Sequence, residues 1–319
     1  MMKRLMLLVL LSVGLFISPI IAEDKPSGYL DEAKTYLAYF DSKGPRPAGK
    51  PAEKTSADYI CTQLESFGYN PLRQPFIKEV VFNKQKIVVS SENIVCVKAG
   101  LDQKEIIVGA HYDSVTAGNG CDDNASGVAV LLEMCKAIKN IKTPYTIRFI
   151  FFGAEELGEV GAKYYVENMD SAQIANTLAM LNYDSLIAGD KMYVHGSLGA
   201  KGIIRDWMIK RATELDIPLI IQRGRNGKYP EGTTGDWGDQ APFDKVGVQY
   251  AAFEATNWDL GDLDGYTQTD TKLGKNGEIW HTKYDKMNYI ERTFPGRIDE
   301  HIKSYFDLLF DFLINFTET

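Results

Sequence analysis

The sequence predicts an α/β fold, a single-domain α/β/α sandwich with a mixed, mostly parallel central sheet. Short apolar segments alternate with segments of helical spacing along most of the chain, which is typical of a largely parallel sheet covered on both faces. The 319 residues are enough for one large α/β domain. Because no internal repeat or low-complexity linker interrupts them, we expect one domain after the N-terminal segment.

Residues 1–22 have the pattern of a signal peptide. Lys3 and Arg4 precede an apolar run that ends at Ala22, where the chain becomes charged, and a small residue at such a boundary is typical of a cleavage site. The run lies at the lower length limit of a membrane span, so an uncleaved anchor helix is the alternative. We favour cleavage and expect an exported protein (secreted, periplasmic or cell-surface) whose domain, residues 23–319, has no stable membrane insertion.

The first part of this domain is expected to combine two helices and a hairpin. Apolar residues recur at helical spacing in 28–40 and 52–67, and the loop 44–49 between them is rich in glycine and proline. Two segments of strand-like composition follow at 72–82 and 86–98, joined by a short polar turn.

The rest of the domain alternates between buried strands and helices. Strands are expected at 106–110, 146–152, 178–182, 191–194 and 249–253. Helices are expected at 128–138, 200–215 and 297–314.

The charge and cysteine content exclude two classes of protein. Asp and Glu number 43 against 35 Lys and Arg, a formal net charge of −8, whereas a nucleic-acid binder that works through a basic surface carries the opposite excess. Four cysteines in a chain of this length do not make a disulfide scaffold, and sequence alone cannot pair them. They are Cys61, Cys96, Cys121 and Cys135.

Acids and a histidine directly follow three of the buried strands. His111 and Asp113 follow the first of them, Glu155 and Glu156 follow the second, and Asp184 follows the third. In open α/β sheets, ligands bind outside the carboxyl ends of the strands. We therefore expect these five side chains to meet at one edge of the sheet.

Two loops add further candidates to this edge. Asp123 lies in GCDDNASG at 120–127, which opens a helix, and His281 lies in a loop before the final helix. Each residue alone has an ordinary alternative, such as a helix cap or a solvated surface group. Together, converging carboxylates repel each other unless cations lie between them. Imidazole and carboxylate ligands suit zinc, although cobalt or manganese can use the same set.

The order of these motifs resembles peptidase family M28, the di-zinc aminopeptidases. That resemblance implies the zinc-exopeptidase type of α/β/α sandwich over residues 23–319, two zinc ions per chain, and hydrolysis of the N-terminal peptide bond of peptides or proteins. It rests on VGAHYDS at 108–114, GCDDNASG at 120–127, FFGAEELGEVGAKYY at 151–165, LNYDS at 181–185 and WHTKYD at 280–285, with a similar lead-in at 44–69.

The same resemblance implies how the metal ligands divide. His111 and Asp184 would bind one zinc ion, Glu156 and His281 would bind the other, and Asp123 would bridge both. The remaining histidines, His195 and His301, match no motif of the family, and we interpret them as packing or surface residues.

Further roles follow from the resemblance. Glu155 would be the general base that takes a proton from the metal-bridging water, and Asp113 would lie behind His111 and orient its ring. The sequence departs from some relatives at Trp280, where they carry a Tyr that steadies the tetrahedral intermediate. Trp280 can donate only through its indole N–H, and we include it among the candidate substrate-binding residues.

The substrate pocket is expected in two stretches near the C-terminal third of the chain. In the glycine-rich stretch 223–244, Asp239 and Phe243 resemble positions where relatives build their substrate pocket. The next stretch, 253–270, is rich in acids and includes Glu254. Our hypothesis is that some of these acids favour a basic N-terminal residue such as Arg or Lys, and a solvated acidic loop is the alternative.

Three other functions share parts of this pattern. M20-type carboxypeptidases and deacylases have a similar order of ligands but insert a lid domain, for which there is little room between Asp184 and His281. A glutaminyl-cyclase-like transferase shares fold and ligands but lacks the D-N-A-S-G continuation found at 123–127. A non-enzymatic binding module is expected to have lost ligands, and none is lost here.

Overall fold

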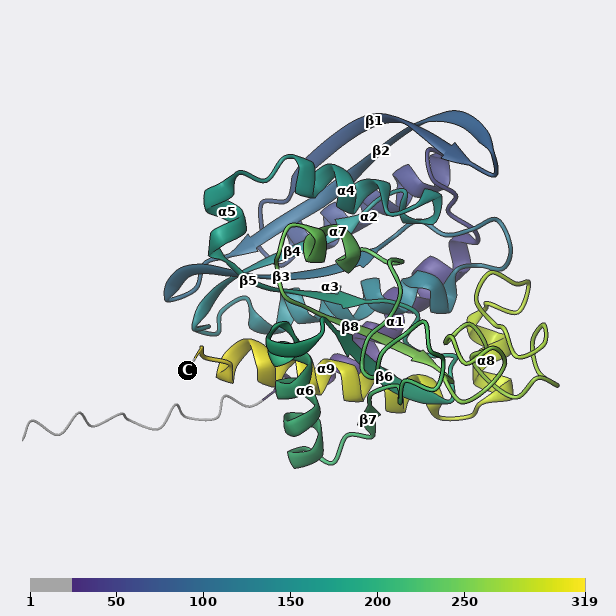
Figure 1. The fold of residues 1–319 in the computed structure, drawn as a ribbon. Coiled ribbons are helices and arrows are strands. Elements are labelled where there is room, and N and C mark those ends of the chain that lie inside the picture. Colours follow the sequence, from purple (N-terminus) through teal and green to yellow (C-terminus); the bar gives the residue numbers. More distant parts are fainter. Residues whose placement is uncertain (1–24, 319) are drawn as a thin grey trace, which may run out of the picture.

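A mixed sheet forms the centre of the molecule in the computed structural model, which describes residues 25–318 (Figure 1). The order of its eight strands in this part of the chain is β1-β2-β4-β3-β5-β8-β6-β7. They are β1 (Leu72–Phe82), β2 (Gln85–Lys98), β3 (Asp102–His111), β4 (Tyr145–Phe152), β5 (Thr177–Tyr183), β6 (Lys191–Gly196), β7 (Leu219–Ile220) and β8 (Tyr250–Thr256).

Parallel pairing joins the middle of the sheet. The strands β4, β3, β5 and β8 are parallel neighbours, as are β6 and β7 at one edge. The β1–β2 hairpin, the β2–β4 pair and the β6–β8 pair are antiparallel. The predicted mixed, mostly parallel sheet is therefore confirmed.

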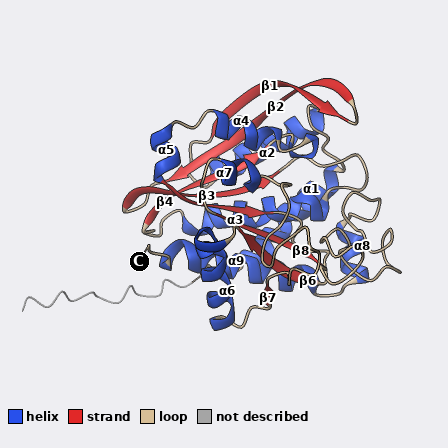
Figure 2. Ribbon diagram, in the orientation of Figure 1, coloured by secondary structure: helices blue, strands red, loops and turns tan. Residues whose placement is uncertain are grey.

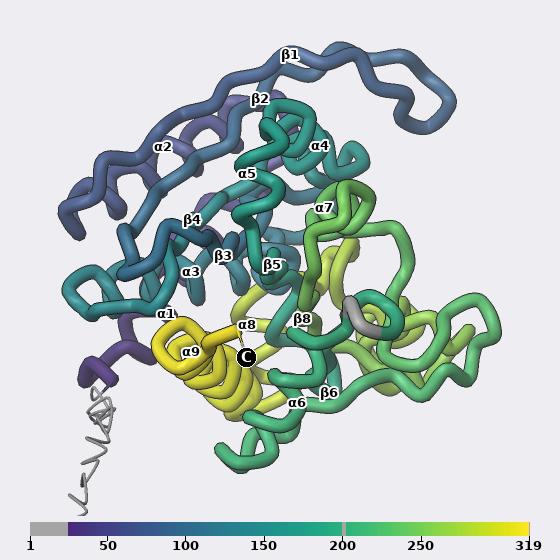
Figure 3. Tube along the Cα trace, turned by 60° about the vertical axis from the view of Figure 1, so that its left-hand side comes forward, coloured from purple at the N-terminus to yellow at the C-terminus, as the bar shows by residue number. Residues whose placement is uncertain are grey.

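Helices cover both faces of the sheet, as Figure 2 shows by colour. Seen from the side, α1, α3 and α9 lie on one face and α4, α5 and α7 on the other (Figure 3). The helices are α1 (Tyr29–Lys43), α2 (Pro51–Ser66), α3 (Ser126–Ile138), α4 (Val160–Glu167), α5 (Ser171–Asn176), α6 (Ile203–Glu214), α7 (Gln240–Lys245), α8 (Met287–Thr293) and α9 (Arg297–Asn315).

Strand β3 shows why the buried strands are apolar on both sides. Ile106 and Val108 belong to the larger core, which also contains residues of α1, α3 and α9. Ile107, between them, belongs to a second core shared with α4 and α7. Because side chains alternate between the faces of a strand, a sheet covered on both faces needs a continuous apolar run.

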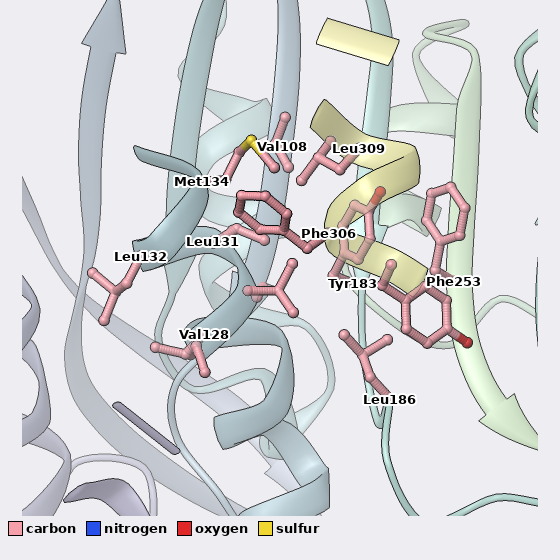
Figure 4. Packing of buried hydrophobic residues seen from close by; sticks show 14 of the residues in the cluster. Val108, Val128, Leu131, Leu132, Met134, Tyr183, Leu186, Phe253, Phe306 and Leu309 are labelled. Atoms are coloured by element: carbon pink, nitrogen blue, oxygen red, sulfur yellow. The ribbon is translucent and has the colours of Figure 1, made fainter. Parts of the chain in front are cut away.

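The larger core holds α3 against the sheet (Figure 4). Leu131 and Met134 of α3 and Phe306 and Leu309 of α9 are fully buried, together with Tyr183 at the end of β5. Truncating a buried side chain of this size typically destabilises a protein by about 2–5 kcal/mol. This packing fixes the start of α3, and with it the loop that carries Asp123.

Five short elements were not predicted from the sequence. The helices α4, α5, α7 and α8 have eight residues or fewer, and β7 has two. Such short segments contain too few turns for a periodic pattern to appear. The predicted signal peptide, residues 1–22, lies outside the described residues. Within residues 25–318, no helix has the length and apolar character that crossing a membrane requires.

Candidate metal centre

The carboxyl ends of three parallel strands bring the predicted site residues together. His111 is the last residue of β3, Asp184 follows β5, and Glu155 and Glu156 lie in a short turn after β4. Nε2 of His111 lies 3.3 Å from Oδ1 of Asp184. The expectation that these strand ends converge at one edge is met.

Asp123 lies between the two histidines. Its Oδ1 is 3.1 Å from Nε2 of His111, and its Oδ2 is 3.0 Å from Nε2 of His281. Nε2 of His281 is also 3.1 Å from Oε2 of Glu156. Two groups of residues can therefore each hold a metal ion, and they share Asp123: one is His111, Asp123 and Asp184, and the other is Asp123, Glu156 and His281.

Hydrogen bonds hold the loop that carries Asp123. Asp285 accepts from the backbone N–H of Asp122 at 2.6 Å and of Asp123 at 3.3 Å. Asn124 donates to the carbonyl oxygen of Tyr183 at 2.8 Å. The loop is thus tied both to the segment after His281 and to the end of β5.

Asp113 touches both the histidine before it and the turn after β4. Its Oδ1 lies 3.6 Å from Nδ1 of His111. The two oxygens also accept from the backbone N–H groups of Glu155 at 2.9 Å and of Glu156 at 3.2 Å. Asp113 therefore links a candidate metal ligand to the turn that carries the predicted general base.

The raised pKa values of His281, Glu156 and Glu155 are typical of a site that attracts cations. Burial opposes the charged ring of His281, but hydrogen bonds to Asp123 and Glu156 raise its pKa to about 12. Burial and the nearby Asp123 raise the pKa of Glu156 to about 7, and burial raises the pKa of Glu155 well above its usual value. Concentrated buried carboxylates of this kind are stabilised by protons or by metal ions.

The geometry and donor types fit zinc. For zinc–ligand distances of about 2.0–2.2 Å, the ligand atoms of a tetrahedron lie about 3.3–3.6 Å apart, close to the 3.0–3.3 Å measured between the histidine nitrogens and the carboxylate oxygens. Asp239 lies outside both metal-binding groups. Both its oxygens are buried and have no hydrogen-bond partner among the described residues, and burial raises its pKa well above the usual value.

The site opens into a cleft of about 300 Å³. The residues of the candidate metal site and its predicted base, which we call the metal-binding floor, are His111, Asp123, Glu155, Glu156, Asp184 and His281, and all except the buried His111 line the cleft. A second group of lining residues, which we call the aromatic wall, is Tyr229, Trp237, Asp264, Tyr266 and Trp280. The hydroxyl of Tyr266 lies 3.5 Å from Nδ1 of His281, so floor and wall meet there.

The predicted substrate residues are placed differently from one another. Glu254 and Trp280 line the cleft, whereas Asp239 is fully buried beside it. Phe243 was wrongly expected in the pocket. Its side chain is fully buried and packs against Phe152 in the core under α4 and α7, because α7 turns its apolar side toward the sheet.

Both remaining histidines pack inside the protein. His195 is buried, and its Nε2 lies 2.9 Å from Oε1 of Glu254, which also accepts from the indole of Trp258 at 2.7 Å. His301 is buried with Nδ1 2.8 Å from the carbonyl oxygen of Leu186. Packing is the correct interpretation for both, and for His195 the contact with Glu254 adds a link to the cleft.

Arg46 is a supporting residue that the sequence analysis did not single out. It is fully buried, and its guanidinium donates to the carbonyl oxygens of Tyr112, Asn119 and Gly120 at 2.9, 2.6 and 2.9 Å. It thereby ties the 44–49 loop to both loops that carry the first metal ligands. Its position in GPRPAG was visible in the sequence, but nothing there indicated burial.

Several residues next to the ligands have unusual backbone conformations. Ala154, Ser185 and His281 have φ values of 56°, 53° and 54°. This left-handed region is unfavourable for residues with a Cβ atom. Such conformations cluster at functional sites, where the surrounding structure enforces them.

Comparison with known proteins agrees with this geometry. The profile described as Peptidase family M28 matches residues 93–306. The chain belongs to peptidase family M28. It is 32% identical to the alkaline phosphatase isozyme conversion protein of Escherichia coli (strain K12), over 90% of each chain. Both the family and the candidate metal site were predicted from the motif order, and the family is confirmed.

Two solved structures have a similar fold. A zinc aminopeptidase from Bacillus subtilis superposes with a TM-score of 0.70, covering 93% of this chain and 98% of the other at 17% identity. A glutaminyl cyclase from Porphyromonas gingivalis superposes with a TM-score of 0.66, covering 88% and 97% at 21% identity. At these identities the likeness shows the fold alone.

Proposed function

We propose that this M28 protein is a zinc-dependent aminopeptidase that removes the N-terminal residue of peptides or proteins. The observation that carries the proposal is Asp123, which directs one carboxylate oxygen at each of two metal-binding histidines. A single acid between two imidazole nitrogens is the arrangement expected of a bridging ligand, and family membership supports it.

The proposed ligands divide as the resemblance implied. His111 and Asp184 would hold one zinc ion, Glu156 and His281 would hold the other, and Asp123 would be shared between them. When bound, two such ions lower the pKa of a water molecule, polarise the scissile carbonyl and stabilise its developing negative charge.

Glu155 is proposed to move the proton in this reaction. As the water oxygen bonds to the carbonyl carbon, the Glu155 carboxylate accepts the proton that the water loses. Glu155 then gives that proton to the amide nitrogen as the C–N bond breaks, so that a free amino acid and a shortened peptide leave. Asp113 holds the backbone of Glu155 and contacts the ring of His111, which supports its role as a positioning residue.

The substrate is proposed to enter with its free N-terminus, with a preference for a basic first residue. Glu254 and Asp264 put carboxylates in the cleft, and no lysine or arginine in the described part of the chain is paired with Asp264. Asp259, which the same hypothesis included, is already neutralised by Lys191 and Arg225. Asp239 and Trp280 complete the proposed substrate-binding residues. Trp280 lines the cleft, whereas Asp239 is buried beside it.

Export is part of the proposal. The signal-peptide pattern of residues 1–22 supports a secreted, periplasmic or cell-surface enzyme, with no nucleic acid among its partners. Mass spectrometry of the protein from its source cell tests this, since cleavage after Ala22 predicts a mature chain that begins at Glu23.

One assay tests the proposed activity. Aminoacyl amides with a free N-terminus should be hydrolysed, their N-acetylated counterparts should not, and o-phenanthroline should abolish the activity until zinc is restored. Activity that survives either acetylation or chelation would falsify the proposal.

A parallel reaction with an N-terminal glutamine peptide tests the glutaminyl-cyclase alternative, because cyclisation releases ammonia without cleaving a peptide bond. Hydrolysis of C-terminal residues or of acylated amines would instead favour the M20-type alternative.

A further inference from the structure

Side chains from distant segments hold the N–H groups of the turn that carries Glu155, in addition to hydrogen bonds within its own backbone. After β4 ends, four consecutive backbone N–H groups, those of residues 153–156, each donate to a buried side-chain oxygen. Gly153 donates to Asn93 at 3.3 Å, and Glu155 and Glu156 donate to Asp113 at 2.9 and 3.2 Å. The conformation of the turn is therefore set in part by residues far away in the sequence.

The remaining N–H group of this turn, that of Ala154, donates to Glu53. The distance to Oε1 of Glu53 is 3.1 Å, and 101 positions separate the two residues. Ala154 has a left-handed backbone with a φ of 56°, which its Cβ atom disfavours. The hydrogen bond that Ala154 donates to Glu53 thus holds the Gly153–Ala154 peptide unit, one residue before the general base, at a residue whose conformation needs support.

Glu53 itself is anchored on three sides. It lies on α2 and its residue is only 3% exposed. Oε2 accepts from the backbone N–H of Gly49 at 2.6 Å, and Oε1 also accepts from the hydroxyl of Ser91 at 2.6 Å. A carboxylate with both oxygens engaged from fixed elements cannot swing away, so it can hold the turn in place.

We propose that Glu53 is a positioning residue for catalysis, which fixes the Ala154 peptide and thereby aims the Glu155 carboxylate. This inference rests on the proposed function of Glu155. Glu53 touches neither the substrate nor a metal ligand side chain, so its contribution is to the orientation of the base. Small misplacements of a catalytic group can reduce a rate by about 10²-fold.

The test compares Glu53→Ala and Glu53→Gln with a matched control. Glu92→Gln makes the same carboxylate-to-amide change on a neighbouring side chain that pairs with Arg73 rather than with the turn. With equal zinc content, we expect Glu53→Ala to lower kcat by about 10- to 100-fold while KM stays within threefold. Glu53→Gln retains one oxygen for Ala154 and should lie between Glu53→Ala and the wild type, and Glu92→Gln should match the wild type.

Two further measurements separate positioning from a merely structural role. Combined with Glu155→Gln, Glu53→Ala should lower the residual rate no further, because the residue through which it acts is gone. Amide hydrogen exchange should accelerate at residues 153–156 in Glu53→Ala and Glu53→Gln but not in Glu92→Gln. If Glu53→Ala does not fold, Glu53→Gln carries the same comparisons.

Three results would overturn the inference: an unchanged kcat in a folded, zinc-loaded Glu53 variant, an equal loss in the Glu155→Gln background, or a loss that follows zinc content. Failure of the proposed aminopeptidase function can be distinguished from failure of this inference, because the wild type itself would then cleave no aminoacyl amide. The exchange measurement still decides in that case whether Glu53 fixes the turn.

Discussion

Four of the six residues of the metal-binding floor lie at or just after the ends of strands, whereas all the residues of the aromatic wall lie in loops. In the floor, His111 and Asp123 are buried at 1% and 7% exposure, Glu155, Glu156 and Asp184 are half-buried, and His281 is exposed. Buried acids hold the backbones of Asp123 and Glu155. On the wall, Trp237 and Tyr266 are 42% and 49% exposed. We therefore expect the proposed bond cleavage to depend on the floor, which is largely held by the sheet, and the proposed substrate selection to depend on the wall, whose loops can vary.

The largest effect is expected from Asp123, the residue shared by both metal groups of the floor. Asp123→Ala removes a ligand from both groups. Losing a residue that only hydrogen-bonds to a ligand typically lowers metal affinity by about 10–100-fold, and losing this shared ligand should lower it further. Metal content after dialysis measures this, with Asp262→Ala, an exposed acid outside the cleft, as the control. Retention of two ions by the variant would contradict the bridging role.

Glu155→Gln should lower kcat by about 10²–10⁴-fold, because general-base catalysis contributes on that scale. Its zinc content should equal that of the wild type, since the ligands remain. Steady-state kinetics with metal analysis of the same sample gives the answer. Near-normal turnover would show that another group takes the proton.

Much of the floor could be predicted from the sequence, but little of the wall. The ligands directly follow apolar strands, and parallel strands meet at one edge, so the order of His111, Glu155 and Asp184 indicated their convergence. No comparable rule places the residues of the wall, because they lie in the loops 221–239 and 257–286, which have neither helical nor strand periodicity. Phe243 shows the limit: it lies in a polar, glycine-rich stretch and is followed by Asp244 and Lys245, yet a short unpredicted helix turns it into the core.

The supports behind the floor were also invisible in the sequence. Arg46 and Glu53 lie in a loop and a helix near the start of the domain, and their burial depends on contacts with segments many residues away. An arginine in a glycine- and proline-rich loop is ordinarily a solvated residue. Only the folded arrangement shows which carbonyl and amide groups these side chains reach.

Arg46→Met tests how far the floor depends on that support. Loss of the guanidinium removes the donor from the buried carbonyl of Tyr112 and from the half-buried carbonyl of Asn119, whereas Gly120 keeps a hydrogen bond from Ala125. Each buried polar group left without a partner costs about 1–3 kcal/mol. Relief from burying a cation offsets part of this, so we expect the free energy of unfolding to fall by about 2–4 kcal/mol. Urea denaturation measures the change, and an unaltered midpoint would show that water replaces the guanidinium.

The smallest effect is expected on the wall. Asp264→Asn should lower the ratio of kcat/KM for Arg-amide over Leu-amide by about twofold to fivefold, because a partly exposed ion pair contributes about 0.5–1 kcal/mol. Zinc content and Leu-amide hydrolysis should not change, and Asp262→Asn should leave the ratio unaltered. A ratio that is already below one in the wild type would end the hypothesis of a basic preference.

The left-handed conformations of Ala154, Ser185 and His281 have a consequence for how this enzyme can evolve. A non-glycine residue in this region costs about 1–2 kcal/mol relative to a relaxed backbone, so selection for heat resistance alone would favour glycine at Ala154. The same replacement would let the turn before Glu155 sample other conformations. A substitution that raises thermal stability at this position is therefore expected to lower turnover. Stabilising substitutions should instead be placed in α9 or in the β1–β2 hairpin.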